Sequence, residues 1–485
     1  MSMIKIEDLS FSYPGSFDTI FDHVSFQLDS RWKLGFVGRN GRGKTTLLRL
    51  LQGQYEYQGR ITHSVVFDYF PYPVPNKNQL TQTVLEEVCP QAQEWELLRE
   101  LGLLNVEPEV LERPFAALSG GEQCKVLLAA LFLNEGHFLL IDEPTNHLDA
   151  QGRALVSAYL RRKKGFILVS HDRRFLDGCV DHILSLNRST IEVQSGTFST
   201  WFENFQRRQQ AELEEDARLK KDISRLQQAA RRSSDWSDRV EASKIGSHAY
   251  DRGFVGHKAA KMMKRAKNIQ ARQEEAITKK SALRKDLEQA QSLKLSPLPH
   301  HAQVVAECSK AVLRYGNGTP VSFALEQGER LALTGPNGCG KSSLLKLLLG
   351  EDLLQSGTCT TASGLVISYV PQDTASLRGS LDDFIQAGAI DETLFKTILR
   401  KLDFERVQFE KDLSDYSEGQ KKKVFLARSL CQRAHLYLWD EPLNYIDLYS
   451  RLQLEELLTS FQPTMLFVEH DEAFREAVAT GSVVF

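Results

Sequence analysis

Four short motifs occur twice in this chain, in the same order and at nearly constant spacing. The first set is a glycine-rich loop at 38–45, Ser-Gly-Gly-Glu at 119–122, Asp-Glu at 142–143 and a histidine at 171. The second set lies at 335–342, 417–420, 440–441 and 470, so the offsets are between 297 and 299 residues. Chance does not repeat four motifs in this way. The chain is therefore predicted to contain two copies of one folding unit that work together.

Length and composition exclude several classes of protein. At 485 residues the chain is long enough for two sizeable cores, and 42% hydrophobic and 25% charged residues are ordinary for a globular protein. It has neither an N-terminal apolar run of signal-peptide type nor the roughly 18–20 consecutive apolar residues of a membrane helix. The seven cysteines are scattered without a C-x-x-C pair, so we expect neither a disulfide framework nor a zinc site. A reducing cytoplasm is the expected location.

Basic residues are concentrated in the middle of the chain. Between 218 and 285 there are 19 Lys and Arg against 7 Asp and Glu, although the whole chain has a net charge of −3. This concentration predicts that the middle segment contacts a polyanion. Apolar residues at helical spacing flank a glycine-containing stretch at 243–256, which favours two long helices packed as an antiparallel coiled-coil hairpin. The alternative is a solvated, charged linker with helical tendency.

These patterns divide the chain into three predicted segments. Residues 1–198 and 300–485 alternate strands and helices, which predicts two α/β domains, each with a largely parallel sheet. Residues 199–299 are the predicted helical linker, with a tip loop at about 236–258. Pro297 and Pro299 mark the end of the linker because proline cannot continue a helix.

Each glycine-rich loop reads G-x-x-x-x-G-K-[ST] between a predicted strand and a predicted helix, the context that indicates a phosphate-binding loop. Glycines let backbone N–H groups turn towards phosphate oxygens, and the following helix presents its positive N-terminal end. We expect Lys44 and Lys341 to reach the β- and γ-phosphates, and Thr45 and Ser342 to ligate Mg²⁺. The chain is thus predicted to be an ATPase that uses ATP and Mg²⁺. A loop used only for a turn is the structural alternative.

An acidic pair follows an apolar strand in each half. Asp142 and Asp440 end their strands, and we expect them to hold Mg²⁺. Glu143 and Glu441 follow directly and are predicted to polarise the attacking water. Because adjacent side chains on a strand point to opposite sides, only the strand terminus lets both acids reach one site. A structural ion pair is the alternative for either acid.

A histidine follows a second apolar strand in each half, His171 and His470, 29 and 30 residues after the Asp. This paired placement predicts a role in sensing the γ-phosphate. With the Ser-Gly-Gly-Glu stretch and the Asp-Glu-Pro step, the pattern resembles the ATP-binding-cassette domains. The run P-T-N-H-L-D at 144–149 looks like that of the ABC-F subfamily, twin cassettes that act on ribosomes, and the resemblance covers essentially the whole chain.

The resemblance implies two cassettes face to face, with each ATP held between the phosphate loop of one and the signature stretch of the other. Tyr13 and Tyr315 match the aromatic residue that stacks on adenine, with core packing as the alternative. The implied ATP-binding residues are Tyr13, Gly38, Asn40, Gly41, Gly43, Lys44, Thr45, Thr46, Ser119, Gly120, Gly121, Glu122, Tyr315, Gly335, Asn337, Gly338, Gly340, Lys341, Ser342, Ser343, Gln372, Ser417, Gly419 and Gln420. The implied metal ligands are Thr45, Asp142, Ser342, Gln372 and Asp440, and the implied catalytic residues are Glu143, Glu441, His171 and His470.

Two departures from the family pattern fall in the same composite site. Tyr72 stands where the first cassette would have its glutamine, beside Lys44. Glu418 stands where the second signature stretch would have a glycine, and it would repel phosphate unless it points away. The other site, with Lys341 and Gln372, follows the pattern. We therefore predict unequal sites, with the Lys341 site the faster hydrolyser.

Three functions compete: a ribosome-acting ATPase, the energy subunit of a transporter, and a cassette-type ATPase of DNA repair or chromosomes. A basic helical segment between two complete cassettes favours the ribosome, because transporter cassettes have short linkers and the DNA enzymes usually split one cassette. Cations interleaved with aromatic residues suit RNA phosphates and unpaired bases. Packing of the turn is the alternative for the aromatics. The expected RNA or tRNA contacts are Arg239, Lys244, His248, Tyr250, Arg252, Phe254, Lys258, Lys261, Lys264 and Arg265.

Further resemblance narrows the group. The first cassette lacks the inserted arm of many housekeeping ABC-F proteins, and the stretches at 260–267, 416–423 and 439–445 look like those of the antibiotic-resistance ABC-F proteins of Gram-positive bacteria. That group protects ribosomes from lincosamides, pleuromutilins and streptogramin A drugs. The resemblance implies an ATP-bound monomer that binds the E site of the bacterial 70S ribosome beside 23S rRNA and P-site tRNA, without a membrane partner. A housekeeping translation factor is the alternative.

Overall fold

The computed structural model describes residues 3–14, 19–186, 190–212, 293–404 and 406–485, together with positions 214, 218, 221, 224, 261, 264 and 268. The side chains of residues 147, 406 and 407 are outside this description. The chain divides into two compact units, one of Met1–Ser199 with Ala290–Phe485 and one of Thr200–Gln289. The predicted hairpin and its tip loop at 236–258 lie outside the described residues, so the coiled coil stays a prediction.

Among its described residues, the first half contains two sheets, six α-helices and three short 3₁₀ helices, Pro108–Glu112, Phe115–Ala117 and Pro144–His147. The antiparallel sheet has the order β2-β1-β4, formed by Thr19–Asp29, Met3–Ser12 and Gln58–Thr62. The larger sheet has the order β5-β6-β7-β3-β8-β9, formed by Val66–Phe70, His137–Asp142, Phe166–Val169, Lys33–Gly38, His182–Leu186 and Ile191–Ser195. All its pairings are parallel except β8 with β9. The helices are α1 Lys44–Leu51, α2 Thr81–Val88, α3 Glu94–Leu103, α4 Gly120–Leu131, α5 Ala150–Arg162 and α6 Arg173–Cys179.

The second half repeats this plan. Its antiparallel sheet is β11-β10-β13, formed by Val321–Glu326, Val304–Leu313 and Leu354–Thr361. Its parallel sheet is β14-β15-β16-β12-β17, formed by Ile367–Val370, Leu436–Asp440, Met465–Val468, Arg330–Thr334 and Gly481–Val484. The helices are α9 Lys341–Leu348, α10 Leu381–Ala387, α11 Glu392–Lys401, α12 Glu418–Cys431, α13 Leu448–Phe461 and α14 Glu472–Val478. The predicted α/β class is confirmed for both halves.

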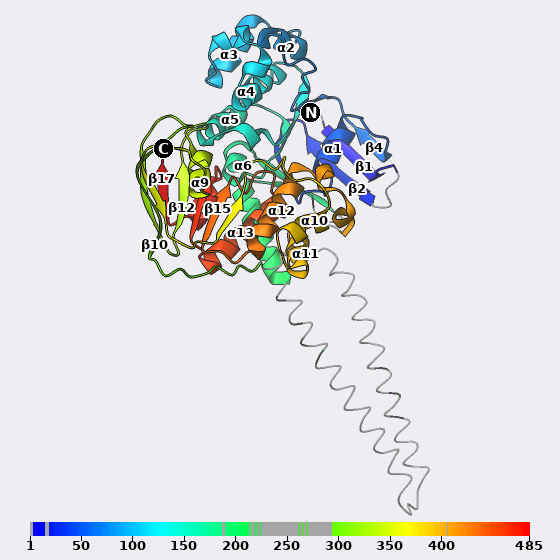
Figure 1. Ribbon diagram of the computed structural model, residues 1–485. Helices are drawn as coiled ribbons and strands as arrows, with labels where there is room; N and C mark the ends of the chain where they lie inside the picture. The colour runs from blue at the N-terminus through cyan, green and yellow to red at the C-terminus, as the bar shows by residue number, and fades with distance from the viewer. Residues whose placement is uncertain are drawn as a thin grey trace, which may run out of the picture. The chain divides into compact units, whose positions relative to one another are not determined.

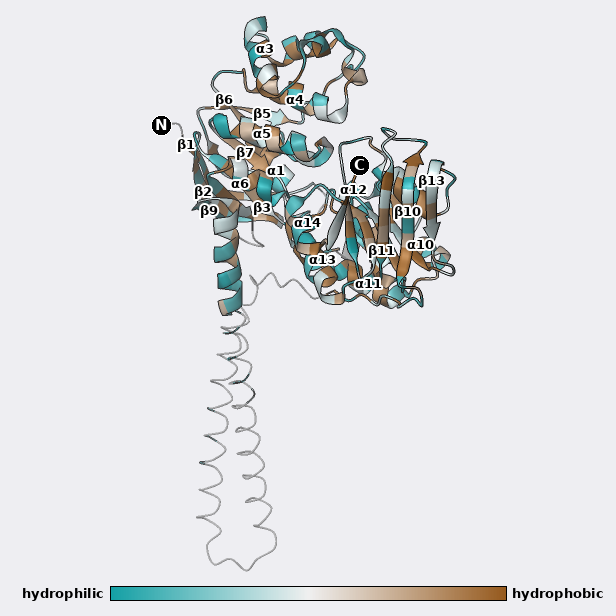
Figure 2. Ribbon diagram, turned by 90° about the vertical axis from the view of Figure 1, so that its left-hand side faces the viewer, coloured by the Kyte–Doolittle hydropathy of each residue, from teal (hydrophilic) through white to brown (hydrophobic). Residues whose placement is uncertain are grey.

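Burial follows the hydrophobic pattern of the strands. The four residues of β7 and the four of β16 are all buried, as is typical of parallel strands covered on both faces. Figure 2 shows β7 in the brown of hydrophobic residues. In the first half, one core joins the antiparallel sheet, α1 and the inner strands of the parallel sheet. This core keeps the phosphate loop at the end of a rigid strand.

The helices that carry the signature stretches form separate layers. In the first half, α2 and α3 both pack on α4, and these three helices lie together at the top of Figure 1. In the second half, α11 packs on α12 in the same way. Each signature stretch is therefore held by packing between helices, in addition to contacts of α4 with β5 and of α12 with β14.

The two halves meet at equivalent helices. Helix α6 packs against α14, and Arg174 on α6 forms an ion pair with Glu472 on α14. In the internal repeat His171-Asp172 matches His470-Asp471, so Glu472 corresponds to Arg173, the neighbour of Arg174. The first turns of the two equivalent helices therefore contact each other where the halves meet.

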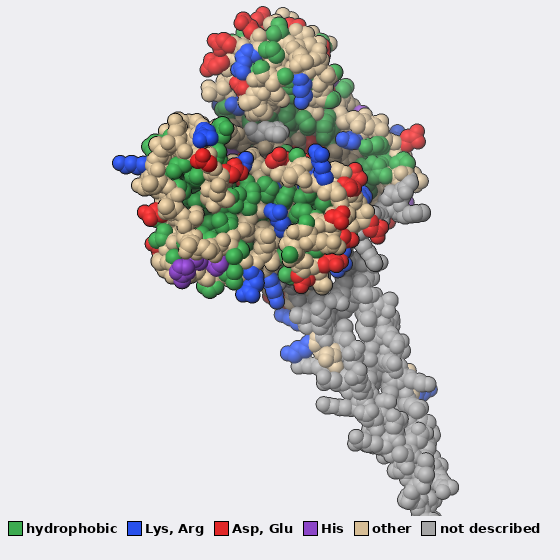
Figure 3. All heavy atoms as spheres, in the orientation of Figure 1, with side chains coloured by type: hydrophobic (Ala, Val, Ile, Leu, Met, Phe, Trp, Pro, Cys, Tyr) green, Lys and Arg blue, Asp and Glu red, His purple; other side chains and the backbone are tan. Residues whose placement is uncertain are grey.

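Charged side chains of both signs are interspersed over the described part of the face in Figure 3. No helix among the described residues is both long and apolar enough to cross a membrane. The excess of basic residues thus belongs to the middle segment of the sequence rather than to this face.

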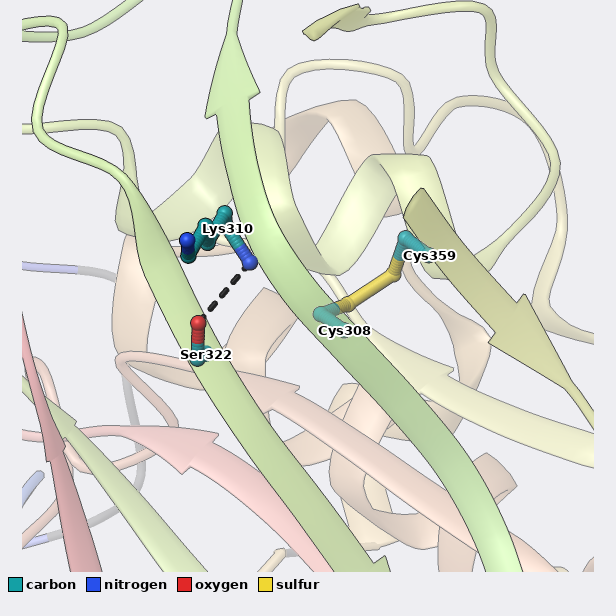
Figure 4. The surroundings of a disulfide bond; sticks show 4 residues. All are labelled: Cys308, Lys310, Ser322 and Cys359. Atoms are coloured by element: carbon teal, nitrogen blue, oxygen red, sulfur yellow. Dashed lines mark hydrogen bonds between the residues drawn. A yellow bond between two sulfur atoms is a disulfide. The ribbon is translucent and has the colours of Figure 1, made fainter. Parts of the chain in front are cut away.

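The expectation of no disulfide is wrong at one position. Cys308 on β10 and Cys359 on β13 form a disulfide bond, shown in Figure 4. The antiparallel register places the two residues directly opposite each other, with Cα atoms 4.0 Å apart. On the other side of β10, the Lys310 backbone N–H donates to Ser322 Oγ at 2.8 Å. The scattered spacing of the cysteines did not reveal this pairing because it depends on strand register.

Candidate active sites

Each phosphate loop joins an interior strand of the parallel sheet to a helix. Strand β3 leads into α1, and β12 leads into α9. The glycine before each lysine caps the helix with a positive φ, 100° at Gly43 and 114° at Gly340. A Cβ atom at Gly43 would lie 2.5 Å from Ile20 Cγ2. Glycine is therefore required here, and it leaves the N-terminal N–H groups of the helix open to a phosphate.

Both loop lysines are buried and donate hydrogen bonds to their own loop. Lys44 Nζ lies 2.6 Å from the carbonyl oxygen of Gly38 and 3.1 Å from Asn40 Oδ1. Lys341 Nζ lies 2.9 Å from the carbonyl oxygen of Gly335. Burial lowers the pKa of Lys44. A phosphate group would restore a strong charged partner to each lysine, which is the chemistry expected of these loops.

The predicted metal-binding acids stand at the carboxyl ends of β6 and β15. Thr45 Oγ1 donates to Asp142 Oδ2 at 2.8 Å. In the second half, burial and the charge of Glu441 raise the pKa of Asp440 to about 6, although a hydrogen bond with Ser342 opposes this. Asp440 Oδ1 is buried and has no hydrogen-bond partner among the described residues. Hydroxyl and carboxylate oxygens are the ligands that Mg²⁺ prefers, so these residues fit the metal.

A left-handed turn brings each glutamate to the same site as its aspartate. Glu143 and Glu441 have φ values of 49° and 46°, a conformation that few non-glycine residues adopt. Each glutamate then faces the predicted histidine: His171 Nε2 is 3.3 Å from Glu143 Oε1, and His470 Nε2 is 3.5 Å from Glu441 Oε1. The sequence-predicted Asp, Glu and His are thus brought together in both halves.

The two glutamates differ in their electrostatic surroundings. Burial, followed by the charge of Asp142, raises the pKa of Glu143 to about 8. Burial also acts to raise the pKa of Glu441, but interactions with His470 and Gln372 outweigh it and lower that pKa below its usual range. A general base must be ionised to accept a proton. The surroundings therefore favour the ionised form of Glu441 and disfavour that of Glu143.

Both signature stretches form helix N-termini. Ser119 caps α4 and Ser417 caps α12, each in a capping box with the residue three positions later. In the first box, the Ser119 backbone N–H donates to Glu122 Oε2 at 2.8 Å. The positive end of each signature helix is therefore available to an anion.

One cavity of about 660 Å³ joins the signature stretch of the first half to the phosphate loop of the second half. This volume lies in the range of small-molecule sites. The predicted residues that line it are Ser119, Gly120, Gly121, Glu122, Tyr315, Asn337, Gly338, Gly340, Lys341, Ser342, Ser343, Gln372, Glu441 and His470. The head-to-tail composite site implied by the resemblance is therefore seen in the arrangement of these residues.

Further residues of the first half line the same cavity. They are Lys125, Asn146, Leu148, Asp149 and Gly152. Sequence reasoning did not place them in the site. The run at 144–149 contains three of them, and in the sequence it indicates the subfamily but not a place in the site.

On the Lys44 side, the second half touches the first phosphate loop directly. Asn40 Nδ2 donates to the carbonyl oxygen of Tyr445 at 2.9 Å, and Arg451 Nη1 donates to the carbonyl oxygen of His171 at 3.1 Å. Gly419 of the second signature stretch packs close to Tyr445, since a Cβ atom at Gly419 would lie 2.6 Å from its carbonyl oxygen. Hydrogen bonds thus bridge the two halves beside Lys44.

The two departures from the family pattern have different surroundings. Glu418 accepts a hydrogen bond from Thr374 Oγ1, and its carboxylate lies 3.5 Å from Lys421 Nζ. Both partners belong to its own half, so the charge of Glu418 is engaged there. Tyr72 is half-buried on the loop after β5. Tyr69, at the end of that strand, donates its hydroxyl to Asp142 Oδ2 at 2.9 Å.

The two candidate adenine-stacking tyrosines are not equivalent. Tyr315 is 65% exposed and lines the cavity. The Tyr13 hydroxyl is hydrogen-bonded to Thr46 Oγ1 at 2.8 Å, and its ring packs edge-on against Phe11 and Tyr55. The geometry favours adenine stacking for Tyr315, whereas the packing alternative describes Tyr13.

Most predicted RNA contacts lie outside the described residues, namely Arg239, Lys244, His248, Tyr250, Arg252, Phe254, Lys258 and Arg265. Lys261 and Lys264 are described and are exposed helical residues. The interface with RNA therefore stays a prediction.

The geometry agrees with the relatives of the chain. A family model described as "ABC transporter" matches residues 21–146 and 319–444. Over 98% of its length the chain is 28% identical to the ribosome protection protein VmlR of Bacillus subtilis, covering 85% of that protein. It is 28% identical to the energy-dependent translational throttle protein EttA of Escherichia coli K12, covering 95% of this chain and 88% of EttA.

Solved structures show the same fold. The archaeal ribosome recycling factor aABCE1, in its complex with the ribosomal stalk protein aP1, matches with a TM-score of 0.64 and 19% identity, over 98% of this chain and 87% of that chain. Two matched copies of the family domain, each with a complete set of motifs, account for both halves. The chain therefore belongs to the ABC transporter family, in its ABC-F branch, and is an ATPase that uses ATP with Mg²⁺.

Proposed function

We propose that this ATPase binds the bacterial 70S ribosome in its ATP-bound state and leaves it after hydrolysis. The main support is similarity over nearly the whole chain to VmlR and EttA, whose names place them in ribosome protection and translation. The basic segment at 218–285 adds a region suited to RNA phosphates. Both features favour a ribosomal partner over a membrane partner.

Within this proposal, the composite cavity at Lys341 is the main hydrolytic site. Glu441 accepts a proton from the attacking water, and His470 orients the γ-phosphate. The N-terminus of the signature helix capped by Ser119, in the other half, offsets the negative charge of that phosphate. Ser342, Gln372 and Asp440 would hold Mg²⁺, which offsets the charge of the phosphates. At the second site Thr45, Asp142, Glu143 and His171 take the same roles. The ionised state of Glu441 supports faster hydrolysis at the Lys341 site.

We further propose the following arrangement on the ribosome. In the cytoplasm, the domains at 1–198 and 300–485 close on two ATP molecules. In this closed form they occupy the E site of the ribosome, beside 23S rRNA. The linker at 199–299 extends towards the peptidyl-transferase centre and P-site tRNA, with Tyr250 or a tip neighbour nearest the drug site. The outcome is protection against lincosamides, pleuromutilins and streptogramin A. Similarity to VmlR supports this reading.

Ribosome co-sedimentation of the Glu143→Gln, Glu441→Gln double variant tests the partner. Removing both proposed bases should leave ATP bound and the closed state long-lived, so the variant should pellet with 70S particles in Mg-ATP and not without nucleotide. A Lys44→Ala, Lys341→Ala variant, which should not bind ATP, is the matched control. Failure to pellet in a variant shown to bind ATP would overturn the ribosomal proposal.

A housekeeping role in translation is the second candidate, because EttA is as similar to the chain as VmlR is. Expression in a drug-sensitive Gram-positive host separates the two. Protection predicts a raised inhibitory concentration for the three drug classes and loss of that rise on alanine replacement of Tyr250, Arg252 and Phe254 together. Unchanged drug sensitivity in cells where the protein co-sediments with ribosomes would favour the housekeeping role.

A further inference from the structure

Two arginines of the first phosphate loop meet one carboxylate of the second half. Arg39 Nη1 is 3.4 Å and Arg42 Nη2 is 3.8 Å from Asp403 Oδ1. The side chains of Arg39 and Asp403 are 10% and 21% exposed, so solvent screens this pairing only in part. Asp403 lies just after α11, in the helical layer that also carries the second signature helix. One acidic residue thus connects that layer to the loop that holds ATP beside Lys44.

A second contact reinforces this connection. The Arg39 guanidinium carbon lies 5.1 Å from the centre of the Tyr449 ring, on the first turn of α13. A guanidinium stacked on an aromatic ring gains a cation–π interaction, which is stronger when it is partly desolvated. Arg39 is therefore held by a charge from one element and by a ring from another.

The internal repeat supplies a control within the same chain. The positions equivalent to Arg39 and Arg42 are Pro336 and Cys339, and the position equivalent to Asp403 is Asn105. Asn105 and Asp403 occupy the same turn: both have positive φ, 50° and 63°, and both donate their N–H to the carbonyl three residues earlier. The backbone is thus repeated, but every charge is replaced by a neutral residue.

The same replacement affects the aromatic contact. Tyr449 corresponds to Gln151, which is neutral and has no ring. Pro336 has no cation to place over it. The Lys341 site therefore has neither the ion pairs nor the cation–π contact, while its geometry leaves the cavity of about 660 Å³ between the halves.

We propose that Arg39, Arg42, Asp403 and Tyr449 form a latch that keeps the Lys44 composite site closed, so that the halves open and exchange nucleotide mainly at the Lys341 site. Asp403 is a positioning residue: it belongs to the opposite half and holds the arginines of the first phosphate loop in place. This inference depends on the ATPase assignment and is independent of a ribosomal partner.

Release of a fluorescent ATP analogue from single sites tests the latch in the full-length chain. With Lys341→Ala, nucleotide binds at the Lys44 site alone, and adding Asp403→Asn should speed release about fivefold. This factor corresponds to about 1 kcal/mol, which is the upper end of the contribution of partly exposed ion pairs. With Lys44→Ala, Asp403→Asn should leave release from the Lys341 site within about twofold. Asn105→Asp is the matched control and should leave both rates unchanged, because the loop positions that correspond to Arg39 and Arg42 are Pro336 and Cys339. Equal release with and without Asp403→Asn, or equal acceleration at both sites, would overturn the proposal.

Salt gives a readout that a merely structural role would not show. Raising KCl from about 50 to about 500 mM should speed release from the Lys44 site when Asp403 is present and have little effect after Asp403→Asn. Arg42→Cys, which introduces the residue of the other loop, should reproduce part of the acceleration and keeps the test valid if Asp403→Asn is poorly folded. Thermal melting of each variant checks the fold. Salt sensitivity that persists in Asp403→Asn would show that other charges hold the site closed.

Discussion

A buried cluster in the first half offers a sharp test of what positions the signature helix. Glu100 on α3 accepts hydrogen bonds from the Tyr159 hydroxyl at 2.8 Å and from Lys163 Nζ. The Glu100 side chain is 4% exposed, and the Lys163 ammonium also lies 4.6 Å from the centre of the Tyr159 ring. Although burial acts to raise the pKa of Glu100, the hydrogen bonds from Lys163 and Tyr159 lower it below its usual range. The cluster joins the α3–α4 layer to α5.

Replacing Lys163 with methionine keeps the stem of the side chain but leaves the Glu100 carboxylate without its main cation. Removal of one partner of a buried pair costs about 3–5 kcal/mol. Arg99, whose Nη2 is 3.2 Å from Glu100 Oε1, remains and offsets part of this cost, although its side chain is 58% exposed. We expect a net loss of about 2–4 kcal/mol in the free energy of unfolding, measured by urea titration. A Glu100→Gln, Lys163→Met double variant should recover part of the loss, because no buried charge is left unpaired.

The second half contains a matched control. Lys396 pairs with Glu392 at 2.7 Å and with Asp382 at 3.0 Å, but both acids are more than 60% exposed. Lys396→Met should therefore cost less than about 1 kcal/mol. Because the pKa of Glu100 is lowered on folding, its contribution should be present above pH 4.5 and lost as the pH falls through its folded value. Equal costs for Lys163→Met and Lys396→Met, or a pH dependence that Lys163→Met leaves unchanged, would refute this account.

Other predictions concern the nucleotide sites. Glu441→Gln should remove most of the steady-state ATP hydrolysis, whereas Glu143→Gln should remove a small part, because the pKa of Glu143 is raised to about 8; equal losses in a phosphate-release assay would contradict unequal sites. Tyr315→Ala should raise the KM for ATP about tenfold through lost stacking. Tyr13→Ala should change it less than about twofold, because that ring packs against its own half; a reversed order of the two effects would count against the adenine assignment.

Local features of both sites were predictable from the sequence because they depend on neighbours along the chain. The loop from β3 to α1 follows from glycine spacing between a strand and a helix. The placement of Asp142 and Glu143 follows from the end of an apolar run. The left-handed φ of Glu143 makes this placement possible, and the sequence contains no direct sign of it.

Contacts between residues that are far apart in the sequence were not predictable. The engagement of Glu418 by Thr374 joins residues 44 positions apart. The bond between Cys308 and Cys359 depends on the register of two antiparallel strands. The contact of Asn40 with Tyr445 crosses from one half to the other, 405 positions away. Composition and spacing contain no information on such tertiary contacts, even where each residue lies in a recognised motif.

The pairing of Arg174 with Glu472 has a consequence for the choice of partner. In the internal repeat Glu472 corresponds to Arg173, and Arg174 corresponds to Ala473. If two copies of the first half met in the same way, Arg174 would face an arginine, and in two copies of the second half Glu472 would face an alanine. Like charges opposite each other are destabilising, and the second arrangement lacks this ion pair, so both mismatched pairings are disfavoured. The ion pair favours the meeting of unlike halves, and covalent linkage supplies the correct partner at high effective concentration. Identical chains should therefore not exchange halves, and each half should pair with the other half of its own molecule.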